Sequence, residues 1–174
     1  MITSNHTIPD RLLPGSTRTA PSTVHQDGDV KYATATSSKI RGRDNITIGT
    51  WNTRTLRAAG KLQELTHEMD RYIWNIFGLC EMRWKNFGET TTKEGHKVFL
   101  SGKEDKNEHG VGFLVHENIM NTVIRCCPVS SRLTIIHLRA DPFNITAVQA
   151  YAPMSDYDNK KVEEFYDKLQ NVTD

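Results

Sequence analysis

The sequence lacks most of the features that mark secreted or membrane-spanning proteins. Its 174 residues include only three cysteines, at positions 80, 126 and 127, and an odd count with one adjacent pair is not a disulfide framework. No apolar run approaches the roughly 18 residues that a membrane-spanning helix needs. The N-terminus has no apolar core of the signal-peptide kind. We therefore expect an intracellular protein, nuclear or cytoplasmic, with buried thiols and no membrane partner.

An excess of charge of one sign is also missing. The 22 lysines and arginines nearly balance the 21 aspartates and glutamates, which gives a formal net charge of +1. This balance argues against a dominant, non-specific electrostatic attraction to nucleic acid, although it is compatible with a local basic patch. Hydrophobic residues make up 37% of the chain, which at this length is enough for one domain with its own core.

The first 44 residues differ in composition from the rest. They are rich in serine and threonine, contain three prolines and show no sustained apolar periodicity. Such a segment does not bury enough apolar surface to offset the entropy that ordering would cost. We expect a disordered extension over residues 1–44 and a domain over residues 45–174. The basic end of the extension, residues 39–43, reads as a solvated linker, with a nucleic-acid contact as the alternative.

The most informative stretch predicts a strand, a helix and a second strand. Ile46–Asn52 and Asn75–Glu81 are short apolar runs bounded by turn residues, which is typical of buried strands. Between them, residues 62–72 carry apolar side chains at helical spacing. A parallel crossover of this length would bring Asn52 and Glu81 to the same end of one sheet, where α/β proteins most often bind ligands. An amide and a carboxylate there can hold a hard cation and a phosphate oxygen.

The remaining chain predicts further strands and one helix. The last element, from Asn159 to Val172, carries apolar residues at the i, i+3, i+4 and i+7 spacing of an amphipathic helix. Short apolar runs predict strands at residues 96–101, 110–116, 122–129, 133–138 and 145–151. The whole pattern indicates an α/β protein.

Four motifs, in order along the chain, carry a family resemblance. They are Thr50-Trp51-Asn52, Gly78-Leu79-Cys80-Glu81, the run Gly110-Val111-Gly112-Phe113-Leu114-Val115, and Tyr151-Ala152-Pro153. Together they resemble the endonuclease/exonuclease/phosphatase family. The nearest likeness is to the apurinic-type endonuclease domain of retrotransposons and to craniofacial development protein 2-like proteins. The resemblance covers residues 45–174 and implies a four-layer α/β sandwich of two packed sheets flanked by helices.

The resemblance also implies a reaction and a cofactor. Members of the family hydrolyse phosphodiesters or phosphomonoesters with Mg²⁺. By motif match, Glu81 would be the metal carboxylate, Asn52 would orient the metal site and the phosphate, and Tyr151 would contact the scissile phosphate. Mg²⁺ is commonly held by one or two carboxylates plus substrate phosphate, which agrees with these roles. Each residue also has a plain structural interpretation, as a turn former, a surface ion-pair partner and a half-buried aromatic residue respectively.

Three basic residues near these motifs are candidates for nucleic-acid binding. Arg54 stands two positions after Asn52, where many relatives of the DNA-repair type carry an acidic residue, and an arginine there suits a phosphate contact. Arg83 and Lys85 follow Glu81 closely.

Two later motifs of the family are not found. The family pattern continues with Gly-Asp-x-Asn and Ser-Asp-His, and all seven histidines here precede Tyr151. We expect a domain truncated after its first half to two-thirds, inactive alone and a weak binder of Mg²⁺. Its exposed sheet surface suggests self-association or a completing partner. The alternative to a DNA endonuclease is a non-catalytic remnant that acts as an interaction or nucleic-acid-binding module.

Overall fold

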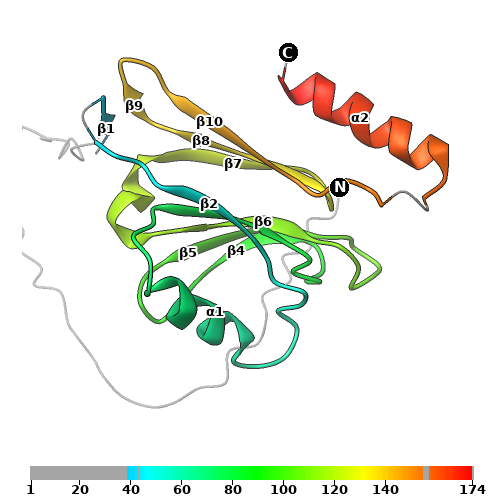
Figure 1. Cartoon of the computed structure of the whole chain (residues 1–174), viewed down its shortest axis with the longest axis horizontal. Helices are drawn as coiled ribbons and strands as arrows, with labels where there is room; N and C mark the ends of the chain where they lie inside the picture. The colour runs from blue at the N-terminus through cyan, green and yellow to red at the C-terminus, as the bar shows by residue number, and fades with distance from the viewer. Residues whose placement is uncertain (1–38, 43, 155–156, 174) are drawn as a thin grey trace, which may run out of the picture. The chain divides into compact units, whose positions relative to one another are not determined.

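The computed structural model describes residues 39–42, 44–154 and 157–173. Over these residues the chain is a mixed α/β protein with several sheets and few helices (Figure 1). No helix within the described ranges combines the length and the hydrophobicity needed to cross a membrane. In chain order the elements are β1 (Ile40–Arg41), β2 (Ile48–Asn52), α1 (Lys61–Met69), β3 (Ile76–Cys80), β4 (Phe87–Thr91), β5 (Lys97–Ser101), β6 (Val111–Val115), the 3₁₀-helix η1 (Glu117–Thr122), β7 (Val123–Ser130), β8 (Leu133–Leu138), β9 (Ala140–Asp141), β10 (Ile145–Ala150) and α2 (Asn159–Thr173).

A five-stranded sheet of order β2-β3-β6-β5-β4 forms the centre of the described chain. The strand–helix–strand prediction is confirmed, because β2 and β3 are parallel and Asn52 lies opposite Cys80. Strand β6 runs antiparallel to β3 and places Val111 opposite Cys80. The residues that follow β2 and β3 and those that precede β6 therefore meet at one end of the sheet. We call this end, residues 52–54, 81–83 and 109–110, the site rim.

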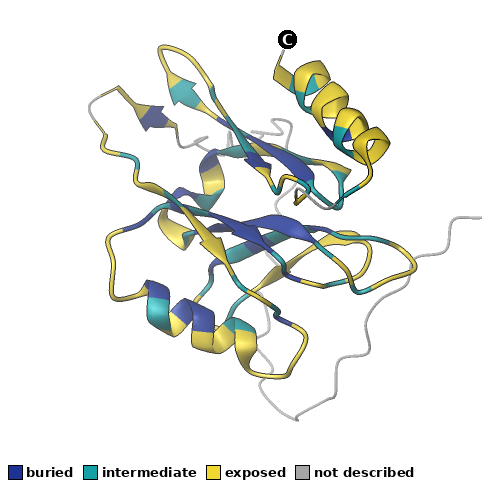
Figure 2. Cartoon of the chain, turned by 45° about the vertical axis from the view of Figure 1, so that its right-hand side comes forward, coloured by how far each residue is buried: buried dark blue, intermediate teal, exposed yellow. Residues whose placement is uncertain are grey.

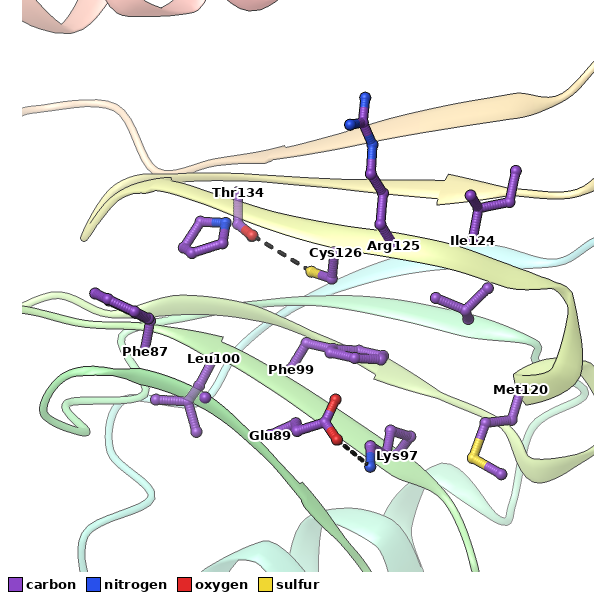
Figure 3. Close-up of a pocket in the computed structure, with 13 residues that line it drawn as sticks. Phe87, Glu89, Lys97, Phe99, Leu100, Met120, Ile124, Arg125, Cys126 and Thr134 are labelled. Carbon is purple, nitrogen blue, oxygen red and sulfur yellow. Dashed lines mark hydrogen bonds and ion pairs between the residues drawn. The ribbon is translucent and has the colours of Figure 1, made fainter. Parts of the chain in front are cut away.

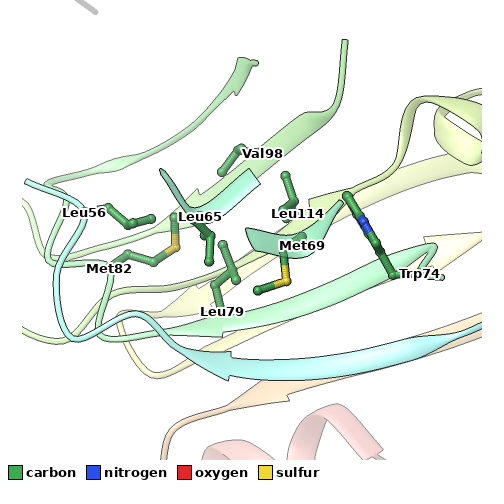
Figure 4. Close-up of a cluster of buried hydrophobic side chains, with 8 residues drawn as sticks. All are labelled: Leu56, Leu65, Met69, Trp74, Leu79, Met82, Val98 and Leu114. Carbon is green, nitrogen blue, oxygen red and sulfur yellow. The ribbon is translucent and has the colours of Figure 1, made fainter. Parts of the chain in front are cut away.

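Helix α1 covers one face of the five-stranded sheet (Figure 4). Met69 of the helix and Leu79 and Leu114 of the sheet have no exposed surface. Burial of large apolar side chains stabilises the fold by about 1.5–3 kcal/mol for each one, so this layer fixes the parallel crossover. The complete cluster is Leu56, Leu65, Met69, Trp74, Leu79, Met82, Val98 and Leu114.

A second, antiparallel sheet of order β10-β8-β7 packs on the opposite face (Figure 2). The second core cluster joins Ile76 and Phe113 of the first sheet to Ile136 and Leu138 of the second. Gln149 of β10 donates a hydrogen bond through Nε2 to Cys80 Sγ at 2.9 Å. Gly78 leaves the space for this contact, since a Cβ there would collide with the Gln149 side chain. The close approach couples the end of β3 to the end of β10.

Two features differ from the expectations. Strand β4 lies in a stretch where no strand was predicted. All five of its residues are exposed, so its sequence lacks the apolar pattern of a buried strand. Strand β1 lies inside the expected disordered extension, 1–44, where Ile40 is buried and pairs with Ala140 of β9. The ordered chain thus begins before residue 45, because a distant strand supplies the partner. Most of the extension, residues 1–38 and 43, lies outside the described residues.

Candidate functional site

Asn52, Glu81 and Tyr151 form a hydrogen-bonded network at the site rim. Asn52 Nδ2 donates to Glu81 Oε1 at 2.8 Å, and the Tyr151 hydroxyl donates to the same oxygen at 2.8 Å. Asn52 ends β2, Glu81 follows β3, and Tyr151 follows β10 of the second sheet. The network therefore gathers the three residues singled out by the motifs from strand ends in both sheets.

The turn after β2 explains why Asn52 lies in this position. Its Oδ1 accepts a hydrogen bond from the Arg54 backbone N–H at 2.9 Å, which closes a tight turn. Thr53 fastens that turn to β3, because both its backbone N–H and its hydroxyl donate to the Cys80 carbonyl, at 3.0 and 2.9 Å. Asn52 is thus a turn former through its oxygen and a partner of Glu81 through its nitrogen.

Backbone strain is concentrated on the site rim. Arg54, Glu81, Arg83 and His109 have φ angles of 56°, 54°, 56° and 58°, in the left-handed region that residues other than glycine seldom adopt. Backbone hydrogen bonds across the rim hold these conformations, for example Arg83 N–H to the His109 carbonyl at 2.8 Å. Strained residues of this kind gather at functional sites because the surrounding structure must compensate their cost.

The environment of Glu81 favours its ionised form. The hydrogen bond from Asn52 is the largest cause of a lowered Glu81 pKa, and Tyr151 and Arg83 add to it, while burial opposes them. Arg83 lies 3.6 Å from Glu81 Oε2 in a partly exposed ion pair. Burial, followed by the contact with Glu81, raises the pKa of Tyr151. At neutral pH the pair is therefore a carboxylate that accepts and a phenol that donates.

The oxygen ligands at the rim suit a cation that is held by one carboxylate. Glu81 Oε1 already accepts two hydrogen bonds, whereas Oε2 forms the longer ion pair with Arg83, whose side chain is 49% exposed. No group of three or more histidine, cysteine, aspartate or glutamate side chains that could hold a metal gathers in the described ranges. Mg²⁺ here would take Glu81 as its protein ligand and complete its coordination with water and substrate phosphate.

The three candidate nucleic-acid-binding residues lie at different distances from the network. Arg54 and Arg83 are exposed on the rim itself and contact Asn52 and Glu81 as described. Lys85 is exposed in the segment that leads to β4, and the hydrogen bonds and ion pairs of the described residues do not connect it to Glu81. The structure thus brings two of the three to the site.

Motif reasoning missed Arg132 and His109. Arg132 Nη1 donates to the carbonyls of Tyr151 and Ala152 at 3.0 and 3.2 Å, and its guanidinium lies 5.1 Å from the Tyr151 ring centre. Its Nη2 lies 3.3 Å from His109 Nε2. Burial, with Arg132 as a second cause, lowers the pKa of His109 to about 4, so this imidazole is neutral and accepts from Arg132. Two sequence features could have pointed to these residues. Arg132 lies in a polar turn between two apolar runs, and His109 directly precedes Gly110.

A separate cavity of about 470 Å³ lies between the two sheets, where the edge strands β4 and β7 face each other (Figure 3). Its lining is largely apolar, with Phe87 and Phe99 among the side chains. The charged pair inside it, Glu89 and Lys97, is joined at 2.7 Å. It contains none of the residues of the network, so we place the candidate site at the rim and not in this cavity.

Comparison with known proteins supports one part of the family resemblance. No family model matches the sequence. The chain is 31% identical over 141 residues to Craniofacial development protein 2 of Tragulus javanicus and 32% identical over 136 residues to that of Bos taurus. These alignments cover 80% and 78% of this chain but 24% and 23% of the relatives, so the chain spans about a quarter of their length. The likeness to craniofacial development protein 2-like proteins is confirmed, and their name specifies no reaction.

Proposed function

We propose that this chain supplies part of a Mg²⁺-dependent phosphodiesterase site that acts on DNA, in a four-layer sandwich of the endonuclease/exonuclease/phosphatase type. The network of Asn52, Glu81 and Tyr151 is the observation that carries the proposal. Three residues separated by 29 and 70 positions meet on one carboxylate oxygen, in a strained backbone and beside exposed arginines.

Each residue of the network has a distinct task. Glu81 would hold the cation, and Asn52 and Tyr151 fix the orientation of its carboxylate through Oε1. The Tyr151 hydroxyl has one proton, which it gives to Glu81 Oε1 here and which it can turn to a phosphate oxygen instead as charge develops there. Mg²⁺ held by Glu81 would supply the neutralisation of charge on the phosphate and on the leaving oxygen. Arg54 and Arg83, exposed on the rim, contact the flanking phosphates.

Activation of the water is the step for which the described residues offer no group. His109 is the histidine next to the network, but its pKa of about 4 makes it a weak base, and its Nε2 faces Arg132. General bases work best when their pKa lies near the operating pH. The chain alone therefore positions a phosphate without activating the nucleophile. This observation also favours the second candidate function, a non-catalytic module that binds nucleic acid.

The dependence of DNA binding on Mg²⁺ separates the two functions. We expect the chain to bind a labelled oligonucleotide more tightly in Mg²⁺ than in EDTA, because the cation would bridge Glu81 and a phosphate. This difference in affinity should vanish in Glu81→Gln. It should persist in Glu89→Gln, which removes a carboxylate from the cavity between the two sheets. Fluorescence anisotropy measures both affinities. Equal binding by the unmodified chain in Mg²⁺ and in EDTA would favour the non-catalytic module.

A further inference from the structure

A second concave surface lies beside the site rim. Its volume is about 430 Å³, and it is bounded by the loop before β6, the turn between β7 and β8, and α2. We call it the basic pocket, after the cationic side chains in its lining: Lys103, Lys106, Arg132, Lys161 and Lys168. Two carboxylates, Glu108 and Glu164, also line it.

The basic pocket has a surplus of positive charge. Lys103 and Glu108 form an ion pair at 3.0 Å and largely cancel each other. Among the described residues, no carboxylate lies within 4.0 Å of the ammonium groups of Lys106, Lys161 and Lys168. The whole chain carries a net charge of only +1, so this local surplus is a departure from its average surface. Such a concave, positively charged surface attracts anions.

Direct contacts connect the basic pocket to the site rim. Arg132 and His109 line the pocket and contact each other at 3.3 Å. Arg132 also holds the Tyr151 carbonyl, while the Tyr151 hydroxyl reaches Glu81. Cationic side chains thus extend from the rim, through Arg132, to the lysines of α2. A strand that carries a phosphate at each nucleotide matches a row of this kind better than a single small anion does.

The chemistry of the lining favours phosphate groups over bases. Lysine ammonium groups act as point charges toward phosphates and carry no sequence information. Of the two aromatic residues in the lining, Phe165 is only 5% exposed, and Tyr157 already has Arg132 at 5.0 Å and Lys161 at 5.9 Å from its ring centre. Its face is therefore engaged by cations and not offered to a base for stacking.

We infer that the basic pocket binds a backbone phosphate of the same nucleic-acid strand whose reacting phosphate lies at the site rim. This inference extends the proposed function, but it concerns α2 and its neighbouring turn, which the proposed chemistry does not use. Binding in the pocket would fix the register of the strand on the rim without selecting a sequence.

The test compares two charge-matched double variants of the full chain. Lys161→Gln with Lys168→Gln removes two cations of the pocket, whereas Lys160→Gln with Lys93→Gln removes two exposed cations outside its lining. All four side chains are exposed, and circular dichroism and thermal melts check that both variants fold. Binding of a labelled single-stranded oligonucleotide of mixed sequence is followed in EDTA, so that the cation at Glu81 plays no part.

We expect the pocket variant to bind about tenfold more weakly at low salt and to lower the salt slope by about 0.7, the value for one lost phosphate contact on a single strand. The control variant should change affinity less than twofold. Equal losses in both variants, or no loss in either, would overturn the inference. Failure of the proposed function would give a different result: the affinity for the oligonucleotide would be the same in Mg²⁺ and in EDTA, while the pocket variant would still bind more weakly.

A competitor identifies the class of ligand. An acidic phosphopeptide of the same charge as the oligonucleotide is added to the complex at equal concentration. We expect it to displace the oligonucleotide poorly, because it lacks evenly spaced phosphates. Displacement as effective as that by unlabelled oligonucleotide would assign the pocket to an acidic protein segment and overturn the nucleic-acid assignment.

Discussion

At the scale of single residues, Glu81 connects the two sheets. Its Oε1 accepts from an amide at the end of β2 and from a phenol at the end of β10. Because charge-assisted hydrogen bonds are stronger than neutral ones, the carboxylate both holds these side chains and is held ionised by them. The same arrangement that orders the rim therefore prepares a ligand for a hard cation.

Replacement of Asn52 by alanine should raise the pKa of Glu81. The hydrogen bond from Asn52 is the largest cause of the lowered pKa, so its loss shifts the titration toward the ordinary value of about 4.3 for a glutamate. Carbon-detected NMR of the side-chain carboxyl measures the shift. Tyr151→Phe should raise the pKa less. A Glu81 pKa unchanged in Asn52→Ala would show that the hydrogen bond does not form in solution.

His109 should make stability depend on pH between about 7 and 4. Its folded pKa of about 4 lies below the unfolded value of about 6.5, so below pH 6.5 the unfolded chain binds a proton that the folded chain does not. Stability therefore falls as pH drops through this window. Burial lowers the pKa of His96 and adds in the same direction.

Urea unfolding at pH 7 and pH 5 measures this effect. The loss of stability between the two pH values should shrink in His109→Gln. It should persist in His67→Gln, which alters an exposed residue of α1. A His109→Gln variant with the same loss as the unmodified chain would contradict the assignment.

At the scale of elements, the apolar pattern of the sequence predicted those strands whose side chains are buried and missed those that depend on exposure or on a distant partner. Strand β8 occupies residues 133–138 as expected, because its apolar side chains fill both faces of a central strand. Strand β4 was missed because its side chains are exposed, and β1 because its partner lies 100 residues away. The same contrast between local pattern and distant pairing applies to the candidate site. Asn52 and Glu81 end predicted parallel strands, whereas the contact of Arg132 with Tyr151 depends on how β8 pairs with β10.

Strand β1 should contribute measurable stability. Ile40 is 6% exposed and belongs to the core cluster between the sheets, so Ile40→Ala should destabilise the chain by about 2–3 kcal/mol. The matched control is Ile73→Ala, because Ile73 is 91% exposed and should change stability by about 0.5 kcal/mol or less. Urea midpoints at pH 7 compare the two variants. Equal effects would place Ile40 outside the core in solution.

At the scale of the whole molecule, the described sheets leave apolar surface uncovered. Ile48 and Trp51 on β2, which is an edge strand, are 50% and 38% exposed. Strand β10 is an edge strand of the second sheet, and its Gln149 contacts Cys80 at the end of β3, the neighbour of β2. The curated relatives are about four times as long as the matched part. We propose this surface as the contact for self-association or for a completing partner, as expected from the sequence.

The central claim is that the rim binds a divalent cation through Glu81, and paramagnetic Mn²⁺ tests it most directly. Mn²⁺ prefers the same carboxylate and water ligands as Mg²⁺ and broadens the NMR signals of nearby nuclei. The account predicts that sub-stoichiometric Mn²⁺ broadens the amide signals of Asn52, Glu81 and Tyr151 first. It also predicts that Mg²⁺ reverses the broadening and that Glu81→Gln abolishes it. Broadening centred elsewhere, or unchanged in Glu81→Gln, would contradict the account.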